Sequence, residues 1–494
     1  MPHSSAPPSG LPALEARLQQ DLEWLALPAG RWTPRVQRDG QPVQDVVVIG
    51  AGMAGLAAAA ALQLQGVHAV LYDRAARDYE GPWATIARME TLRSPKHLTG
   101  PALGLPSLTF RAWYEAQFGR EAWDALDKIP RLQWMDYLRW YRRVLKLEVR
   151  NEHELISLVP RDDGVTVLTL SHRGERHTVL ARHVVLALGM DAFGGSSLPD
   201  VVRDVPQRYW SHTSAPPDYA ALKGKRVAVV GGSASAMDAA ATSLEAGASE
   251  VEILIRRPDF PRFNRTKGVS NPGFRQGYAA LPDAWKWQLE HALLTEQIAP
   301  PHGSTLRVSR HDNVWFNFSS PVTRIRPRQH DVLVHTPKGD IAVDHVILAT
   351  GYRLDWAAQP AFSALVPHIR RWGDAFQPPP DQQHEQLAEH PYLNDDFSFQ
   401  PRSAQAPAAI SNVYCFCHPA HLSNGHVIGL IPGISQAAQT VAEAIVGKLY
   451  VDDRDHHYQG IMAYDDPELL GDEWTPAGPF DTHSVNTIDH SESA

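Results

Sequence analysis

The sequence of 494 residues predicts an α/β protein in which one strand–turn–helix unit interrupts another. Residues 46–49 are four β-branched apolar residues that run into a glycine turn and then into an alanine-rich stretch, and residues 226–244 repeat the pattern. Such unbroken apolar strands are typical of a parallel sheet with both faces covered. Two later apolar runs, at 183–189 and 346–352, reach a glycine at or near their ends. We expect the first of these runs to return the chain to the first sheet and the second to return it to the first domain.

The first glycine turn has the spacing of a phosphate-binding loop. Gly50, Gly52 and Gly55 occupy the three glycine positions of a G-x-G-x-x-G pattern. In that pattern the first glycine permits the turn, the second lets the backbone approach a pyrophosphate, and the third lets helix and strand pack closely. The pyrophosphate lies at the positive N-terminus of the helix. The next strand, 68–72, ends in Asp73, which we expect to accept hydrogen bonds from a ribose.

The second turn departs from this pattern in the middle. Gly231 holds the first position, Ser233 replaces the second glycine, and Ala236 replaces the third. A serine Cβ crowds a pyrophosphate, although its hydroxyl can donate to a phosphate oxygen, and alanine is accepted at the third position. The strand that follows ends in Arg256 and Arg257.

The charges that follow the two turns are opposite. Asp73 accepts from a free 2′-hydroxyl and repels a 2′-phosphate, which suits the adenosine of FAD. Arg256 and Arg257 suit a 2′-phosphate through charge-assisted hydrogen bonds. We therefore predict two Rossmann-like dinucleotide-binding domains, with an NAD(P)H domain that prefers NADPH inserted into a FAD domain. If the arginine pair is only a solvated strand end, NADH remains an option.

These landmarks divide the chain. Leucines at helical spacing from Leu14 predict a docking helix near the N-terminus, and the aromatic residues of 111–147 are expected to be core. An insertion as long as 258–313 is typical of a lid or a binding segment. The predicted parts are 1–44, the N-terminal extension; 45–215, the first part of the FAD-binding domain; 216–340, the NAD(P)H-binding domain with the insertion 258–313; 341–450, the return of the FAD-binding domain; and 451–494, an acidic C-terminal tail.

Composition excludes several classes of protein. A formal net charge of -9 argues against general nucleic-acid binding, which needs a basic surface. No apolar run approaches the length of a membrane span, and residues 1–10 lack the basic and apolar blocks of a signal peptide. Cys415 and Cys417 are too close for an ordinary disulfide, which favours the cytoplasm. Homo-oligomerisation stays open.

Metal binding is not expected. His418, His421 and His426 follow the two cysteines closely, but their spacing matches no zinc pattern. A strand and loop beside a flavin account for this segment.

The candidate active-site residues come from loops without a clear period. In a flavin-type fold the loop after the second strand passes the isoalloxazine, so Trp83 and Arg88 are expected at the cofactor and Arg93 and Lys96 in catalysis. A surface loop with solvated cations is the alternative. Two glycines next to predicted elements are further cofactor candidates: Gly351 and Gly433. Polar residues of the insertion suit an oxygen-rich or anionic ligand, unless they only form a cationic surface: Asn264, Arg265 and Arg275.

The layout resembles the flavin monooxygenases with two dinucleotide-binding domains, which include flavin-containing monooxygenases, Baeyer–Villiger monooxygenases and ornithine or lysine N-hydroxylases. Departures are Pro206 and Arg208 before His212, where a linker motif of flavin-containing monooxygenases has Phe and Gly, and Leu430 in place of an Asp. The resemblance covers about residues 45–450 and rests on Asp73, Phe397, Phe399 and the segments 50–55, 81–83, 231–236, 349–352, 390–393 and 431–434.

The resemblance implies a monooxygenase reaction. NADPH reduces the flavin, the reduced flavin adds dioxygen at C4a, and the hydroperoxide hydroxylates a small substrate. The blocks 91–106 and 301–311 are most similar to the bacterial urate hydroxylases of this group, which implies conversion of urate to 5-hydroxyisourate. N-hydroxylation and Baeyer–Villiger or sulfur oxidation are the alternatives. More remote are a flavin disulfide reductase that uses Cys415 and Cys417, and a flavoprotein without turnover.

Overall fold

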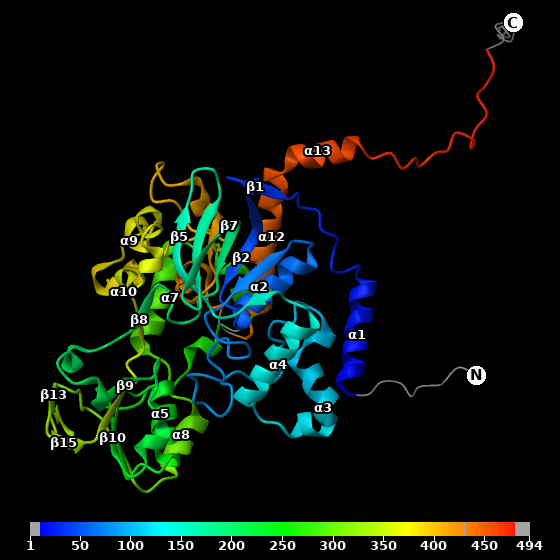
Figure 1. The fold of residues 1–494 in the computed structure, drawn as a ribbon. Helices are drawn as coiled ribbons and strands as arrows, with labels where there is room; N and C mark the ends of the chain where they lie inside the picture. Colours follow the sequence, from blue (N-terminus) through cyan, green and yellow to red (C-terminus); the bar gives the residue numbers. More distant parts are fainter. Residues whose placement is uncertain (1–9, 270, 429–430, 480–494) are drawn as a thin grey trace, which may run out of the picture. The chain divides into compact units, whose positions relative to one another are not determined.

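The fold comes from a computed structural model that describes residues 10–269, 271–428 and 431–479 (Figure 1). The chain divides into two compact units, one that ends at Leu449 and one that begins at Tyr450. Leu430 lies outside the described residues, so its predicted place near the flavin stays a prediction.

The first glycine turn follows a central strand of a mixed sheet, called here the first sheet. Its order is β4-β3-β2-β7-β6-β5, with β1 paired to β2 and β18 to β7. Neighbours from β4 to β7 are parallel, as are β7 and β18, whereas β5 and β6 join antiparallel. The strands are β1 (Val36–Arg38), β2 (Gln41–Ile49), β3 (Ala69–Tyr72), β4 (Val149–Arg150), β5 (His153–Pro160), β6 (Thr166–His172), β7 (Glu175–Leu186) and β18 (Val413–Cys415). The predicted N-terminal extension therefore contains β1 and the start of β2.

Helices rich in aromatic residues pack beside this sheet. In α3 (Phe110–Ala125) and α4 (Arg131–Val144) the rings form one buried cluster, as the helical spacing predicts, although Phe118 is exposed. Helix α1 (Leu11–Trp24) buries Leu18 and Leu22 and packs against α3. The other helices that cover the first sheet are α2 (Met53–Leu64) and α12 (Ile434–Asp452).

The second glycine turn belongs to a separate parallel sheet, called here the second sheet. Its order is β12-β11-β10-β16-β9, and helix α5 (Ala234–Glu245) packs on it. The strands are β9 (Trp210–His212), β10 (Arg226–Val230), β11 (Glu250–Leu254), β12 (Val314–Asn317) and β16 (His345–Leu348). Smaller sheets are formed by β13 (Arg324–Pro327), β14 (Val332–Thr336) and β15 (Gly339–Val343), and by β8 (Gly194–Ser196) with β17 (Tyr352–Leu354).

Strand pairing moves the limits of the second sheet beyond those predicted. Strand β9 lies before residue 216, and β16 lies after residue 340, yet both pair within the second sheet. The strand in the run at 346–352 therefore belongs to the second sheet. The expected return of this run to the first domain stays a prediction. An apolar parallel strand looks the same in either sheet, so only the pairing distinguishes them. The other predicted limits stay predictions.

The insertion 258–313 packs against helix α5 of the second sheet and also against a helix near the C-terminal end of the first unit. Its helix α7 (Asp283–Glu296) packs against α11 (His421–Asn424), whereas α8 (His302–Ser309) packs against α5. The remaining short helices are α6 (Pro272–Gly277), α9 (Trp372–Ala375) and α10 (Glu385–Ala388). The insertion therefore packs between α5 and α11.

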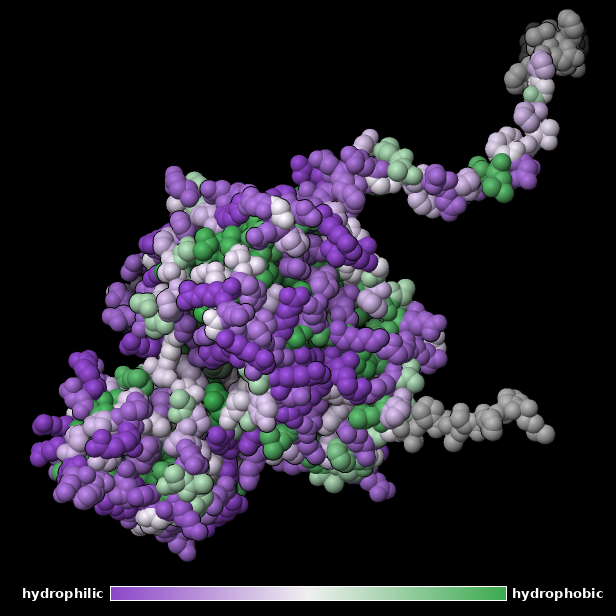
Figure 2. All heavy atoms as spheres, viewed as in Figure 1, coloured by the Kyte–Doolittle hydropathy of each residue, from purple (hydrophilic) through white to green (hydrophobic). Residues whose placement is uncertain are grey.

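The visible face of the first unit is largely hydrophilic (Figure 2). Figure 2 shows hydrophobic residues only in small, separate groups on the visible face, which is hollowed between the parts that carry the two sheets. The unit that begins at Tyr450 contains α13 (Arg454–Met462), where Tyr450 stacks on His457. Among the described residues, no helix combines the length and the apolar character needed to cross a membrane.

Candidate active site

Two glycines of the first turn are required by the protein's own backbone. Gly50 has φ 101°, and a Cβ there would lie 2.3 Å from the carbonyl oxygen of Ala187, just after β7. A Cβ on Gly55 would lie 1.9 Å from the carbonyl oxygen of Gly50. These contacts bring β2, α2 and the end of β7 close together, which is the arrangement that the sequence pattern predicts.

The middle glycine has open space in front of it. A Cβ on Gly52 would meet only Gly81, at 3.6 Å, and Gly81 itself has φ 75°. Gly52 is also the N-cap of α2, and no side chain caps that helix end. The first N–H groups of a helix need an acceptor, and a phosphate at this position supplies one. The turn therefore fits the pyrophosphate of a dinucleotide.

Asp73 lies beside this turn. One carboxylate oxygen accepts from the backbone N–H of Ala51 at 2.7 Å, and the other from that of Ala75 at 2.7 Å. The carboxylate is buried, and each oxygen keeps a lone pair for a further donor. The structure thus joins Asp73 to the glycine turn, at the position expected for a ribose acceptor.

Side chains of the loop after β3 contact residues of the hydrophobic clusters at both sheets. Trp83 packs edge-on against Trp134, and its indole N–H is buried without an acceptor among the described residues, which suits a cofactor heteroatom. Arg88 donates to the carbonyls of Thr85 and Ala87 and lies over the ring of Tyr219 at 5.4 Å. Its guanidinium therefore points toward the second sheet.

Lys96 has a structural position. Its ammonium donates to the carbonyls of Trp123, Asp124 and Leu126, at 2.6, 3.1 and 2.5 Å. These carbonyls lie at the C-terminal end of α3, where the negative end of the helix dipole attracts a cation. Since an ammonium has three donors, none is left for a substrate. The geometry therefore opposes the predicted catalytic role.

Arg93 meets the insertion instead. It donates to the carbonyl of Ala299 at 2.6 Å, and the N–H of Ala299 donates to the carbonyl of Phe263 at 3.0 Å. Partial burial lowers the pKa of Arg93. Asn264 follows Phe263 directly, so the structure brings two predicted site residues from distant parts of the sequence close together. Arg275 lies apart from this contact, half-buried on α6.

The second turn repeats the first in its backbone contacts. Gly231 has φ 139°, and a Cβ there would lie 2.6 Å from the carbonyl oxygen of Ala349, just after β16. Ser233 is the exposed N-cap of α5 and makes no capping hydrogen bond with its side chain. Ala236 is fully buried. The serine hydroxyl therefore lies where it can donate to a phosphate.

The strand-end arginines lie next to a cavity of about 440 Å³. Arg256 is exposed, and Arg257 lines the cavity while it donates to the carbonyls of Thr295 and Glu296. Arg265, a predicted substrate residue, lines the same cavity and pairs with Glu296. The other lining residues include Phe260, Arg262 and Phe263. Cations and aromatic rings together suit a phosphorylated adenosine.

Gly351 directly precedes β17, and Gly433 directly precedes α12. Gly351 has φ 81° between β16 and β17, and its carbonyl accepts from the N–H of Ser197. A Cβ on Gly433 would lie 2.7 Å from the Cα of Val427. Gly433 thus lets the start of α12 lie directly against the preceding loop.

A buried ion pair links the insertion to the segment after β18, and its carboxylate was not predicted from the sequence. Glu290 of α7 pairs with His426 at 2.8 Å, and Tyr278 reaches the same carboxylate at 3.5 Å. The neighbouring His421 is buried, which holds its pKa well below the usual range. A Glu in a helical stretch is ordinarily a surface residue, so no local signal marks Glu290.

Comparisons with known proteins agree with this geometry. A family model described as pyridine nucleotide-disulphide oxidoreductase matches residues 44–267. A FAD-dependent urate hydroxylase from Xanthomonas campestris pv. campestris is 39% identical over 467 residues, which are 94% of this chain and 98% of the relative.

Solved structures share the fold. An ornithine N-hydroxylase from Kutzneria sp. 744 has a TM-score of 0.63 and 16% identity, over 82% of this chain and 100% of that one. The ornithine hydroxylase of Pseudomonas aeruginosa gives 0.65 and 18%, over 82% and 100%. The L-lysine 6-monooxygenase of Pseudomonas syringae gives 0.64 and 17%, over 82% and 99%. At these identities the likeness concerns the fold alone.

The two glycine turns on two sheets form the layout of flavoproteins with two dinucleotide-binding domains, and the match to a FAD-dependent urate hydroxylase places the chain among the monooxygenases of this layout, as the sequence predicts. Within this class, the match along nearly the full length of both chains decides the family. The chain belongs to the family of the FAD-dependent urate hydroxylase.

Proposed function

We propose that this enzyme uses FAD, NADPH and dioxygen to hydroxylate urate to 5-hydroxyisourate. The observation that carries the substrate is the 39% identity to a FAD-dependent urate hydroxylase over 94% of this chain. FAD, when bound, supplies the electron transfer and the oxygen activation. The protein has to hold both ligands in place and keep water out.

The first turn would hold FAD. Gly50 and Gly55 shape the turn, and Gly52 leaves room for the pyrophosphate at the start of α2. Asp73 would accept from the ribose, and Trp83 has a buried N–H to offer. We assign Arg88, Gly351 and Gly433 to the surroundings of the same cofactor.

The second turn would hold NADPH. Gly231, Ser233 and Ala236 form the phosphate turn, and the cavity beside Arg257 is lined by further arginines that suit a 2′-phosphate. Arg256 would reach this phosphate from the exposed strand end. NADH remains the alternative if these cations serve only their present carbonyl and carboxylate partners.

The substrate would bind between the loop after β3 and the insertion. Urate is anionic near neutral pH, and Arg93 is a half-buried cation. Arg93 bonds to Ala299, and Ala299 bonds in turn to Phe263, the residue before Asn264. The contact between Arg93 and Ala299 supports a site at this junction. We give Lys96 no part in it, because its donors are used at the end of α3.

We also propose domain limits that follow strand pairing. The NAD(P)H-binding domain would run from Trp210 to Leu348, with FAD-binding segments at 45–209 and 349–450. A cytoplasmic location is supported by Cys415 and Cys417, which are free thiols whose sulfur atoms share a hydrogen bond at 3.6 Å.

A disulfide reductase is a poor alternative. Cys415 and Cys417 are both buried, and burial raises the pKa of the Cys415 thiol. An exchange reaction needs an accessible thiolate. The pair therefore lacks the reactivity that this function requires.

The first test follows NADPH oxidation in air with and without uric acid, and uric acid loss in the same samples. Equal losses of NADPH and uric acid would support the proposal. NADPH loss with intact uric acid would refute the substrate and direct attention to amines, ketones and sulfides. If NADPH does not bleach the flavin, the enzyme assignment itself fails.

A further inference from the structure

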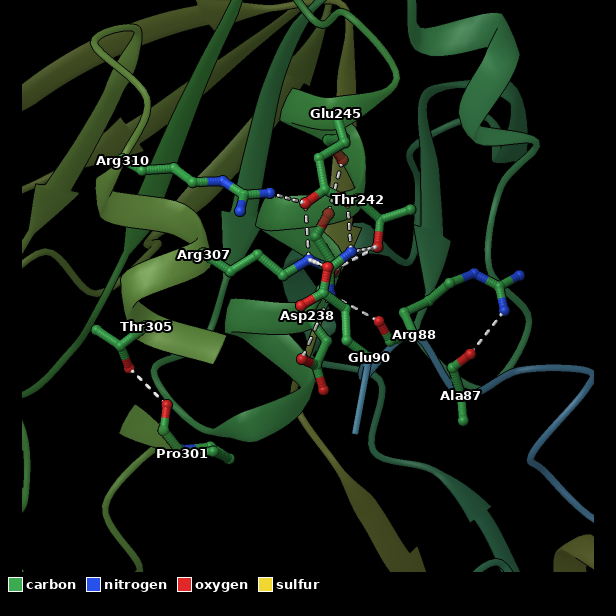
Figure 3. Close-up of polar contacts among 12 residues, drawn as sticks. Ala87, Arg88, Glu90, Asp238, Thr242, Glu245, Pro301, Thr305, Arg307 and Arg310 are labelled. Carbon is green, nitrogen blue, oxygen red and sulfur yellow. Dashed lines mark hydrogen bonds and ion pairs between the residues drawn. The ribbon is translucent and has the colours of Figure 1, made fainter. Parts of the chain in front are cut away.

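Arg307 joins three parts of the molecule. It lies on α8 of the insertion, and its side chain is buried. Two of its nitrogens donate to the carboxylate of Glu245 at 2.8 and 2.6 Å, so the pair is bidentate. A third nitrogen donates to the backbone carbonyl of Arg88 at 2.8 Å. Figure 3 shows this guanidinium between Glu245 of α5 and the loop that carries Arg88 and Glu90.

The segment 87–93 also contributes a side chain of its own to the core beside the second sheet. The side chain of Arg88 lies over the ring of Tyr219, which belongs to the buried cluster around β10 and α5. Arg93 adds a hydrogen bond to Ala299 of the insertion. The seven residues of this loop are therefore held by Arg307 from the insertion and by their own arginine side chains.

Further carboxylates surround the guanidinium of Arg307 and depend on its positive charge. Asp238 of α5 is buried 4.0 Å from the guanidinium, and its Oδ1 has no hydrogen-bond partner among the described residues. Glu90 lies at 3.6 Å on the loop side. Arg307 is thus the shared counter-ion of carboxylates that come from both sides of the junction. A planar guanidinium with five donors can serve two carboxylate oxygens and a carbonyl together.

We propose that Arg307 is a positioning residue that sets the distance and angle between bound NADPH and FAD for hydride transfer. The turn that would hold the FAD pyrophosphate lies beside Gly81, a few residues before the segment 87–93, since a Cβ on Gly52 would be 3.6 Å from the Cα of Gly81. The turn that would hold NADPH opens the helix that carries Glu245. Arg307 connects these two supports directly. This inference rests on the proposed use of FAD and NADPH, and it does not depend on urate as the substrate.

The test compares Arg307→Gln with Arg310→Gln. Arg310 directly follows the same helix and pairs with the same Glu245 at 2.7 Å, but it is exposed, and among the described residues it makes no hydrogen bond or ion pair with the loop that carries Arg88. In Arg307→Gln we expect flavin reduction by NADPH to slow by about tenfold to a hundredfold, since small misplacements have effects of this size. NADP⁺ affinity, measured by calorimetry, should change little. Arg310→Gln should match the wild type.

A second readout needs no cofactor. Backbone hydrogen exchange of the segment 87–93 in the apoprotein should become faster in Arg307→Gln and stay unchanged in Arg310→Gln. Arg307→Lys keeps the charge but not the fork, so it should restore stability more than the reduction rate. If Arg307→Gln does not fold, Tyr219→Leu weakens the other attachment and should also slow reduction and quicken exchange.

A folded Arg307→Gln enzyme with the wild-type reduction rate and wild-type exchange would overturn the proposal. So would an Arg310→Gln enzyme that is equally slow, because the effect would then be one of general charge. Failure of the substrate proposal looks different: uric acid stays intact in every variant, while the reduction rates still separate Arg307→Gln from its control.

Discussion

Alanine substitutions at Gly55 and Gly52 would separate the part of the first turn that serves the fold from the part that serves FAD. In Gly55→Ala the new Cβ lies 1.9 Å from the carbonyl oxygen of Gly50, so the backbone has to move by about 1 Å or more. Overpacking of this kind costs about 1–3 kcal/mol, and the better helix propensity of alanine offsets about 1 kcal/mol of it. The apoprotein should therefore be destabilised.

Gly52→Ala should behave in the opposite way. The residue has φ -69° and ψ -172°, which alanine adopts freely, and the nearest atom to the new Cβ is 3.6 Å away. Its apoprotein should be as stable as the wild type or more stable by about 0.4–1 kcal/mol, because the unfolded chain loses freedom. The methyl group occupies the space in front of α2, so FAD affinity should fall by about tenfold or more, which corresponds to about 1.4 kcal/mol.

Urea unfolding of the apoproteins and FAD titration by flavin fluorescence measure the two effects. Gly447→Ala is a matched control, since this exposed helical glycine has no neighbour within 4 Å and should gain about 1 kcal/mol without any effect on FAD. The reasoning fails if Gly52→Ala binds FAD like the wild type, or if it destabilises the apoprotein as much as Gly55→Ala does.

Four further predictions concern individual side chains or, in one case, a neighbouring pair. Burial lowers the pKa of His183 to about 3, so below pH 6.5 the unfolded chain binds a proton at this residue that the folded protein does not bind. From pH 7 to pH 5 this residue should remove about 2 kcal/mol of stability. In urea unfolding, the free energy of unfolding of His183→Gln should fall by that much less than that of the wild type over this range, and equal falls would contradict the assignment. Lys96→Met should cost about 1–3 kcal/mol of stability at the end of α3 and leave kcat and KM for uric acid unchanged; an altered kcat in a stable variant would restore a catalytic role. The double variant Arg256→Gln and Arg257→Gln should raise KM for NADPH about tenfold or more and leave KM for NADH alone, and parallel changes would exclude a 2′-phosphate contact. Arg93→Ala should raise KM for uric acid with a smaller effect on kcat, and an unchanged KM in steady-state assays would remove Arg93 from the substrate site.

The sequence by itself determined the two strand–turn–helix units and the acid beside the first turn. These features depend on neighbours in the chain: an apolar run makes Val46–Ile49 a buried strand, and only glycine permits φ 101° at Gly50. Asp73 comes directly after its strand, so its place at the turn follows from the parallel order of β2 and β3. Local patterns were sufficient for all of them.

The tertiary structure alone decided which sheet each strand joins and which cations are free. Strand β16 reads like a strand of the first sheet, but pairing with β10 places it in the second. The sequence made Lys96 a candidate for catalysis, but in the fold its ammonium donates to three carbonyls at the end of α3. Arg307 reaches the carbonyl of Arg88 across 219 residues of sequence. No local pattern reports such a contact, because hydrogen bonds and ion pairs form between groups that only the folded chain brings together.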